Sequence, residues 1–181
     1  MLSLLALTLI FGAAEVSTEQ KDPDPPALRL QLTALGGASV FDVEPSLPKG
    51  GSRGPVAGAA VSVRATRSPF TNGGGKFGIL LTLQGLFEPL AQRLDWGGVA
   101  SMTVTLLRLV ITTGIGYGLS SLSGEAPRHS IVLRSGLALP LGPFFLSVVL
   151  DANFRPGTNG RTMQLLAGVA YEFELARLFE N

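Results

Sequence analysis

The chain contains no cysteine, and only one of its 181 residues is a histidine. Without cysteine there can be no disulfide, thiol catalysis, cysteine-ligated metal or lipid anchor on cysteine, and one histidine rules out a histidine-rich metal site within one chain. Charge is scarce too. Charged residues make up 15% of the chain and the net charge is +1, so no basic field suggests nucleic acid. We therefore expect no cofactor, no metal, no catalytic residue and no nucleic-acid partner.

Apolar residues make up 46% of the chain, and one apolar run lies at its start, from Leu2 to Phe11. The run suits the hydrophobic region of a secretory signal and is too short to span a bilayer as a helix. Small residues follow it, so we expect a signal peptide over 1–14, cleaved after Ala14, and Sec-type export. The run lacks the usual preceding Lys or Arg, which leaves an uncleaved anchor or a misassigned start as alternatives. A polar, Pro-rich lead-in follows over 15–26.

The most hydrophobic stretch, Gly97 to Leu122, has the length of a transmembrane helix. Three features argue against a helix. Arg108 falls in its middle, where a charge facing lipid is costly. Valine, isoleucine, threonine and glycine dominate, which favours strands. Hydroxyl residues at 101, 103 and 105 alternate with apolar ones, which is the period of a strand. We therefore expect two strands joined by a tight turn at 107–108, with a helix as the alternative.

The same alternation continues along the chain and predicts about eight strands, each long enough to cross a bilayer when tilted. The expected strands cover approximately 27–38, 55–66, 76–87, 96–106, 109–120, 129–139, 143–155 and 161–175. This is an all-β fold, an eight-stranded antiparallel up-and-down transmembrane barrel over 27–175, with a short C-terminal tail over 176–181. An even strand count puts both ends of the barrel on the periplasmic side. External loops are then expected at 39–54, 88–95, 121–128 and 156–160, and periplasmic turns at 67–75, 107–108 and 140–142.

A soluble lipocalin-like barrel has the same alternation, with its apolar face inside. Two features favour the inverted arrangement, in which apolar side chains face lipid. The polar face carries small residues and few charges, as a narrow lumen requires. The aromatic residues of the apolar face fall near the strand ends, as in the girdles of membrane barrels. The predicted girdle residues are Phe77, Phe144, Tyr171 and Phe173 at the periplasmic end, and Phe87, Trp96, Tyr117 and Phe154 at the external end.

The inward face carries a few ionisable residues, placed so that opposite charges meet. Arg29 and Arg64 lie low in the first two strands, as Glu172 and Glu174 do in the last, which closes against the first. Arg134 and Asp151 lie at similar heights on adjacent strands. Buried charges need partners, so we expect these residues to form a polar network in the lumen.

With these features, 27–175 resembles the small eight-stranded outer-membrane barrels, the OmpA/OmpX/OmpW-like group. Gly168, Tyr171 and Phe173 match the Gly-x-x-aromatic-x-aromatic spacing of the outer-membrane assembly signal. The resemblance implies recognition of this strand by the barrel-assembly machinery, insertion as a monomer, and a place in the outer membrane of a Gram-negative bacterium. The chain departs from the group by continuing past the terminal aromatic with "ELARLFEN".

The sequence leaves three functions open. The first is a non-enzymatic, porin-like outer-membrane protein whose lumen is largely filled by side chains and whose external loops serve a structural role or contact an unknown surface partner. The second is a lipid-modifying barrel enzyme using His129 and Ser130, although adjacent strand residues point to opposite faces. The third is the soluble ligand-binding barrel.

Overall fold

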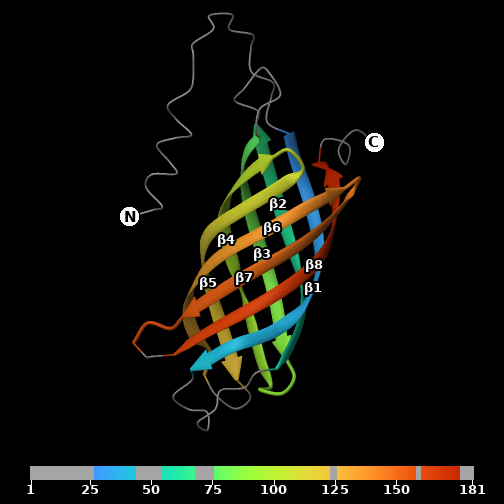
Figure 1. The fold of residues 1–181 in the computed structure, drawn as a ribbon. Helices are drawn as coiled ribbons and strands as arrows, with labels where there is room; N and C mark the ends of the chain where they lie inside the picture. The colour runs from blue at the N-terminus through green and yellow to red at the C-terminus, as the bar shows by residue number, and fades with distance from the viewer. Residues whose placement is uncertain (1–26, 44–53, 68–75, 123–125, 158–159, 176–181) are drawn as a thin grey trace, which may run out of the picture.

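The computed structural model describes residues 27–43, 54–67, 76–122, 126–157 and 160–175, which form one closed β-barrel (Figure 1). The expectations for 1–14, 15–26 and 176–181 lie outside the described residues. The predicted fold class is confirmed, because eight antiparallel strands follow one another around the wall. The strands are β1 (Ala27–Val43), β2 (Pro55–Arg67), β3 (Lys76–Glu88), β4 (Arg93–Leu106), β5 (Leu109–Leu122), β6 (Arg128–Leu141), β7 (Phe144–Phe154) and β8 (Arg161–Glu174).

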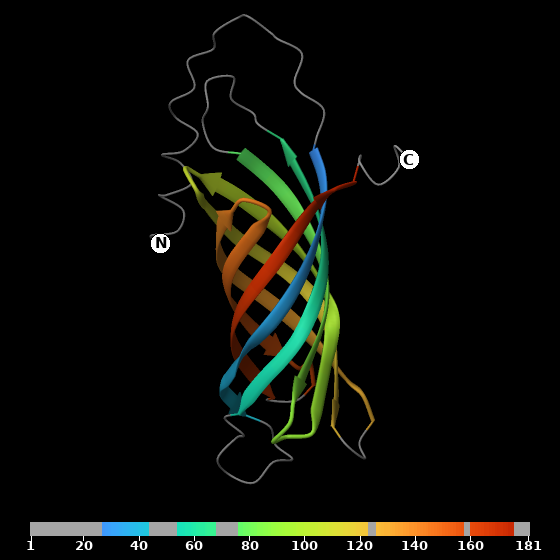
Figure 2. The same ribbon diagram turned by 90° about the vertical axis from the view of Figure 1, so that its right-hand side faces the viewer.

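The barrel closes where β8 pairs with β1, with Leu32 opposite Tyr171 and Leu35 opposite Gly168. Paired residues followed once around the wall from Glu174, through Arg29 on β1 and Asp151 on β7, return to β8 at Gln164, ten residues from the start. This stagger makes the strands wind obliquely about the barrel axis (Figure 2). β1 begins and β8 ends at the same end of the barrel, called here the entry end (Figure 1). The other end, where β1 finishes, is called the opposite end.

Side chains alternate between the two faces of the wall along every strand. On β3, Leu81 and Leu83 are 56% and 71% exposed, whereas Thr82 between them is 4% exposed. On β2, Val61 and Val63 are exposed while Ser62 and Arg64 are buried. The apolar face is therefore outside and the more polar face lines the interior, the reverse of a soluble barrel.

The stretch from Gly97 to Leu122 forms most of β4 and β5, so the helix alternative is wrong there. Arg108 lies in the tight turn between these strands rather than in the middle of a span. Among the described residues, no helix is long and apolar enough to cross a membrane.

Three of the expected external loops are shorter than predicted, and the one between β5 and β6 spans 123–127 instead of 121–128. β1 continues to Val43 through an irregularity between Ser39 and Phe41, so 39–43 are strand and not loop. β4 begins at Arg93, which leaves only 89–92 to connect β3 and β4. The turn between β6 and β7 consists of Gly142 and Pro143, where the φ of +67° at Gly142 suits a residue without a Cβ.

Candidate functional site

The entry end of the lumen holds an ion cluster in which two arginines share one glutamate. The Arg29 and Arg64 guanidinium groups approach Glu172 to 2.7 and 2.6 Å, and the Glu172 side chain is 5% exposed. Gln31 donates to the same carboxylate at 2.6 Å. Glu174, the fourth predicted charge, is half exposed and lies 3.7 Å from Arg29. The structure thus brings all four predicted ionisable residues of this end together.

Arg64 also reaches across the interior. Its guanidinium carbon lies 4.8 Å from the centre of the Phe145 ring, within the range of a cation–π contact. Arg64 comes from β2 and Phe145 from β7, so the contact joins strands that are not neighbours. The Arg64–Phe145 contact fills part of the lumen next to the ion cluster of the entry end.

A second network crosses the middle of the lumen. Arg134 on β6 makes two bonds to Asp151 on β7, at 2.8 and 2.6 Å, and Asp151 is fully buried. Gln84 on β3 donates to Asp151 at 2.9 Å and accepts a bond from Arg134. Since β3 and β7 lie on opposite sides of an eight-stranded barrel, these bonds span the bore. The predicted Arg134–Asp151 pair is brought together, and Gln84 joins it.

The third network, near the opposite end, was not predicted. Arg93 is 1% exposed and contacts Glu88 at 2.6 Å and Asp95 at 3.1 Å. Asp95 accepts bonds from Ser120 on the adjacent strand and from Gln164 on β8, across the barrel. Arg93 and Asp95 fell in the expected loop 88–95, so they were not assigned to the lumen. Their alternation with the apolar residues Leu94 and Trp96 is the sequence signal that could have placed them on the inward face of a strand.

Between the middle network and the Arg64–Phe145 contact lies a cavity of about 80 Å³. Hydroxyl groups of Ser62, Thr82, Thr103 and Thr112 line it together with apolar residues such as Leu166. Apolar side chains also meet inside the wall, where Val56, Leu86 and Leu166 pack together. A cavity of this size, with hydroxyl groups in a mainly apolar lining, has room for a few water molecules. The three networks and this packing fill the bore at successive heights.

The outward face carries aromatic side chains near both ends of the wall. At the entry end, Phe144, Tyr171 and Phe173 stack edge to face. At the opposite end, Phe87, Trp96, Tyr117 and Phe154 are 38–53% exposed. Phe77 is the second residue of β3, at the entry end, and is partly buried. These positions match a pair of aromatic belts around an aliphatic band, as lipid interfaces select.

The residues of the assembly signal occupy the last strand. Gly168 is buried beside Ser147 and Leu35, and a Cβ there would approach both side chains to 2.9 Å. Tyr171 lies on the outward face, and Phe173 stacks on it at the entry end. The recognition of this strand by assembly machinery stays a prediction.

His129 and Ser130 do not meet. His129 is exposed on the outward face, where its Nδ1 contacts the Tyr117 hydroxyl. Ser130 is 4% exposed and points into the lumen. Their strand positions place the two groups on opposite sides of the wall, so a serine–histidine pair does not form here. No group of three or more potential metal ligands occurs within the described part of the chain.

No protein-family model and no curated protein matches the chain. Among solved structures, the chain is similar to the attachment invasion locus protein Ail of Yersinia pestis, in complex with the heparin analogue sucrose octasulfate. That match has a TM-score of 0.52 and 12% identity, over 81% of this chain and 99% of Ail.

Ail in a phospholipid bilayer nanodisc matches with a TM-score of 0.48 and 14% identity, over 80% of this chain and 99% of that one. Neisserial surface protein A matches with a TM-score of 0.39 and 14% identity, over 84% and 100% of the two chains.

The Ail likeness at TM-score 0.52 agrees with the observed topology, the apolar outward face and the polar interior. A closed wall with its apolar side outward is suited to lipid, because it leaves no strand edge unpaired in the hydrocarbon. The chain therefore has the fold of the small eight-stranded outer-membrane β-barrels, the OmpA/OmpX-like group, and is built to cross a membrane with its strands.

Proposed function

We propose that this chain is a non-enzymatic, monomeric protein of the outer membrane of a Gram-negative bacterium, and that it acts through its external segments while its lumen stays closed. The entry end faces the periplasm, and the opposite end faces outward. The barrel is delivered by a signal peptide over 1–14 and assembled through its last strand, with Gly168, Tyr171 and Phe173 as the signal.

One observation supports the proposal that the lumen is closed. Side chains bond across the bore at two heights, Gln84 to Asp151 and Gln164 to Asp95, each bond joining strands on opposite sides of the wall. Opening the bore to water would break both bonds, and a hydrogen bond to a charged group contributes about 1.5–3 kcal/mol. An eight-stranded barrel is also narrow enough for side chains to fill.

The non-enzymatic part of the proposal is supported by the separation of His129 and Ser130 on opposite faces of the wall. Within the described part of the chain, neither residue is hydrogen-bonded to an acid, and the contact of His129 is with Tyr117. An acyl-transfer site needs nucleophile and base within hydrogen-bond reach. The described residues do not supply that arrangement at this position.

Conductance across a planar lipid bilayer tests the closed lumen. The refolded protein is expected to insert without producing discrete current steps, because the cross-lumen networks block the bore. Insertion is checked independently by heat-modifiable migration on gels, and a known open porin serves as the positive control. Stable current steps from inserted, folded protein would contradict the proposal.

A further inference from the structure

Arg161 is placed unlike every other charged strand residue whose side chain the structure describes. Those other side chains, from Arg29 on β1 to Glu174 on β8, belong to the inward-facing register of the wall. Arg161, the first residue of β8, belongs to the outward-facing register and is exposed. Its guanidinium makes no hydrogen bond or ion pair within the described part of the chain.

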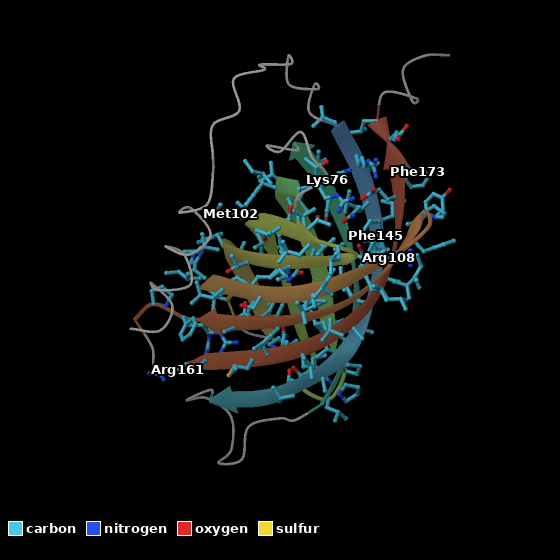
Figure 3. All side chains as sticks on the ribbon, turned by 45° about the horizontal axis from the view of Figure 1, so that its top comes forward. Lys76, Met102, Arg108, Phe145, Arg161 and Phe173 are labelled. Carbon is cyan, nitrogen blue, oxygen red and sulfur yellow. The ribbon has the colours of Figure 1, made fainter. Side chains whose placement is uncertain are left out.

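The position along the barrel axis explains how the wall tolerates this charge. Figure 3 shows Arg161 and Phe173 at opposite ends of the molecule, so Arg161 lies beyond the aliphatic band. The cost of an outward arginine is largest at the middle of a bilayer and falls nearly to zero near the interface. At this height the guanidinium meets lipid headgroups rather than acyl chains.

Phe154 and His129, on the two strands beside Arg161, add an aromatic ring and a second hydrogen-bond donor to the outward face. Phe154 on β7 is its register partner and is itself paired with Ile131 on β6. His129 stands two residues beyond Ile131 on the same outward face. The Tyr117 hydroxyl contacts Nδ1 of His129, which leaves Nε2 for an outside group. Nε2 is a donor in the tautomer whose Nδ1 accepts from Tyr117, and in the imidazolium form.

Among the strand side chains that the structure describes, no acid lies on the outward face beside these donors. The described acidic side chains on strands all belong to the inward register, and most of them already bind arginines. Adjacent strands lie about 4.8 Å apart and each residue rises about 3.4 Å along a strand, so the Cα atoms of His129 and Arg161 lie about 12 Å from each other. A planar guanidinium binds phosphate through two parallel hydrogen bonds. The patch formed by His129, Phe154 and Arg161 is thus complementary to an anionic, phosphorylated headgroup.

We propose that this patch binds the phosphate of an outer-leaflet lipid, with Arg161 as the anchor and His129 as a second donor. The proposal rests on the orientation given under Proposed function, which puts the opposite end of the barrel at the outer leaflet. Through this patch, the outer surface of the barrel prefers phosphorylated lipids among those that surround it.

Native mass spectrometry of the full-length protein, released from detergent with two competing lipids, tests the assignment. The lipids are lipid A carrying its two phosphates and the same lipid with both phosphates removed. The unchanged protein is expected to retain the phosphorylated lipid preferentially. In Arg161→Gln the preference is expected to fall about fivefold, since one cation near a membrane surface contributes about 1 kcal/mol of attraction.

Arg108→Gln is the matched control, because Arg108 is also exposed but lies in the β4–β5 turn at the entry end. This variant is expected to keep the full preference. Equal retention of both lipids by the unchanged protein, or an equal loss in the two variants, would overturn the proposal. Heat-modifiable migration of each variant shows that the barrel is intact, so a failure here is distinguishable from a failure of the proposed membrane barrel.

Discussion

Individual side chains in this barrel have their environment set by which face of the wall they occupy. Leu81 and Thr82 are neighbours in sequence, yet the first is 56% exposed and the second 4% exposed. A leucine this exposed is unfavourable in water and favourable in hydrocarbon. A charged side chain at position 81 is therefore expected to destabilise the barrel in a lipid bilayer.

Leu81→Arg is therefore expected to lower the free energy of unfolding by about 2–4 kcal/mol, since Leu81 lies near the middle of β3. The measurement is a urea titration of protein folded into phosphatidylcholine vesicles. Phe87→Arg, on the same face but at the opposite end of the strand, is the control, with an expected cost below that of Leu81→Arg. Equal costs at the two depths would contradict the lipid-facing assignment.

Whole strands are held in register by close contacts between their backbones, and glycine permits the closest of these. A Cβ at Gly58 on β2 would overlap the Gly85 carbonyl oxygen on β3 and lie 2.9 Å from Leu86 Cδ2. Gly85 on β3 pairs with Ala59 and belongs to the outward face, and a Cβ there would meet nothing within 4 Å. Gly58 is therefore needed for the close approach of β2 and β3, whereas Gly85 is not.

Gly58→Ala is expected to destabilise the barrel by about 1–3 kcal/mol, because a backbone oxygen cannot move aside without shifting the β2–β3 register. Gly85→Ala is expected to be neutral or stabilising by up to about 1 kcal/mol, through the lower entropy of the unfolded chain. Both are measured by urea titration in the same vesicles. The close-approach argument fails if the two variants prove equally stable.

At the level of the whole molecule, the direction of the barrel decides which segments reach the cell exterior. β1 begins and β8 ends at the entry end, so the connections after β1, β3, β5 and β7 leave the wall at the opposite end. The connection after β1 contains Lys49 and Arg53 and lies outside the described residues apart from Gly54. Under the proposed orientation it is external.

Trypsin added to intact cells is expected to cut after Lys49 or Arg53 and to leave the barrel folded. The fragments are read from the membrane fraction by mass spectrometry. Cells with a permeabilised outer membrane provide the comparison. Cleavage only after permeabilisation would reverse the orientation, and recovery of the protein free in the periplasm would refute the membrane barrel.

Much of the fold could be predicted from the sequence because the β-pleat is a local rule. Successive residues face opposite sides whatever their distant neighbours are, so a period of two identified all eight strands and the outward face of each. The main errors were at strand ends. Ser39–Val43 and Arg93–Asp95 were assigned to loops, where polar residues that continue the alternation resemble solvent-exposed connections.

The sequence by itself determined the number of strands, the sides of the wall and the inward charges that adjacent strands bring together, such as Arg134 and Asp151. Only the tertiary structure decided which groups meet across the bore. Gln84 reaches Asp151 from 67 positions away, and Gln164 reaches Asp95 from 69. The physical reason is that these contacts depend on closure of the barrel and on its ten-residue stagger, and both belong to the complete ring of strands rather than to any one of them.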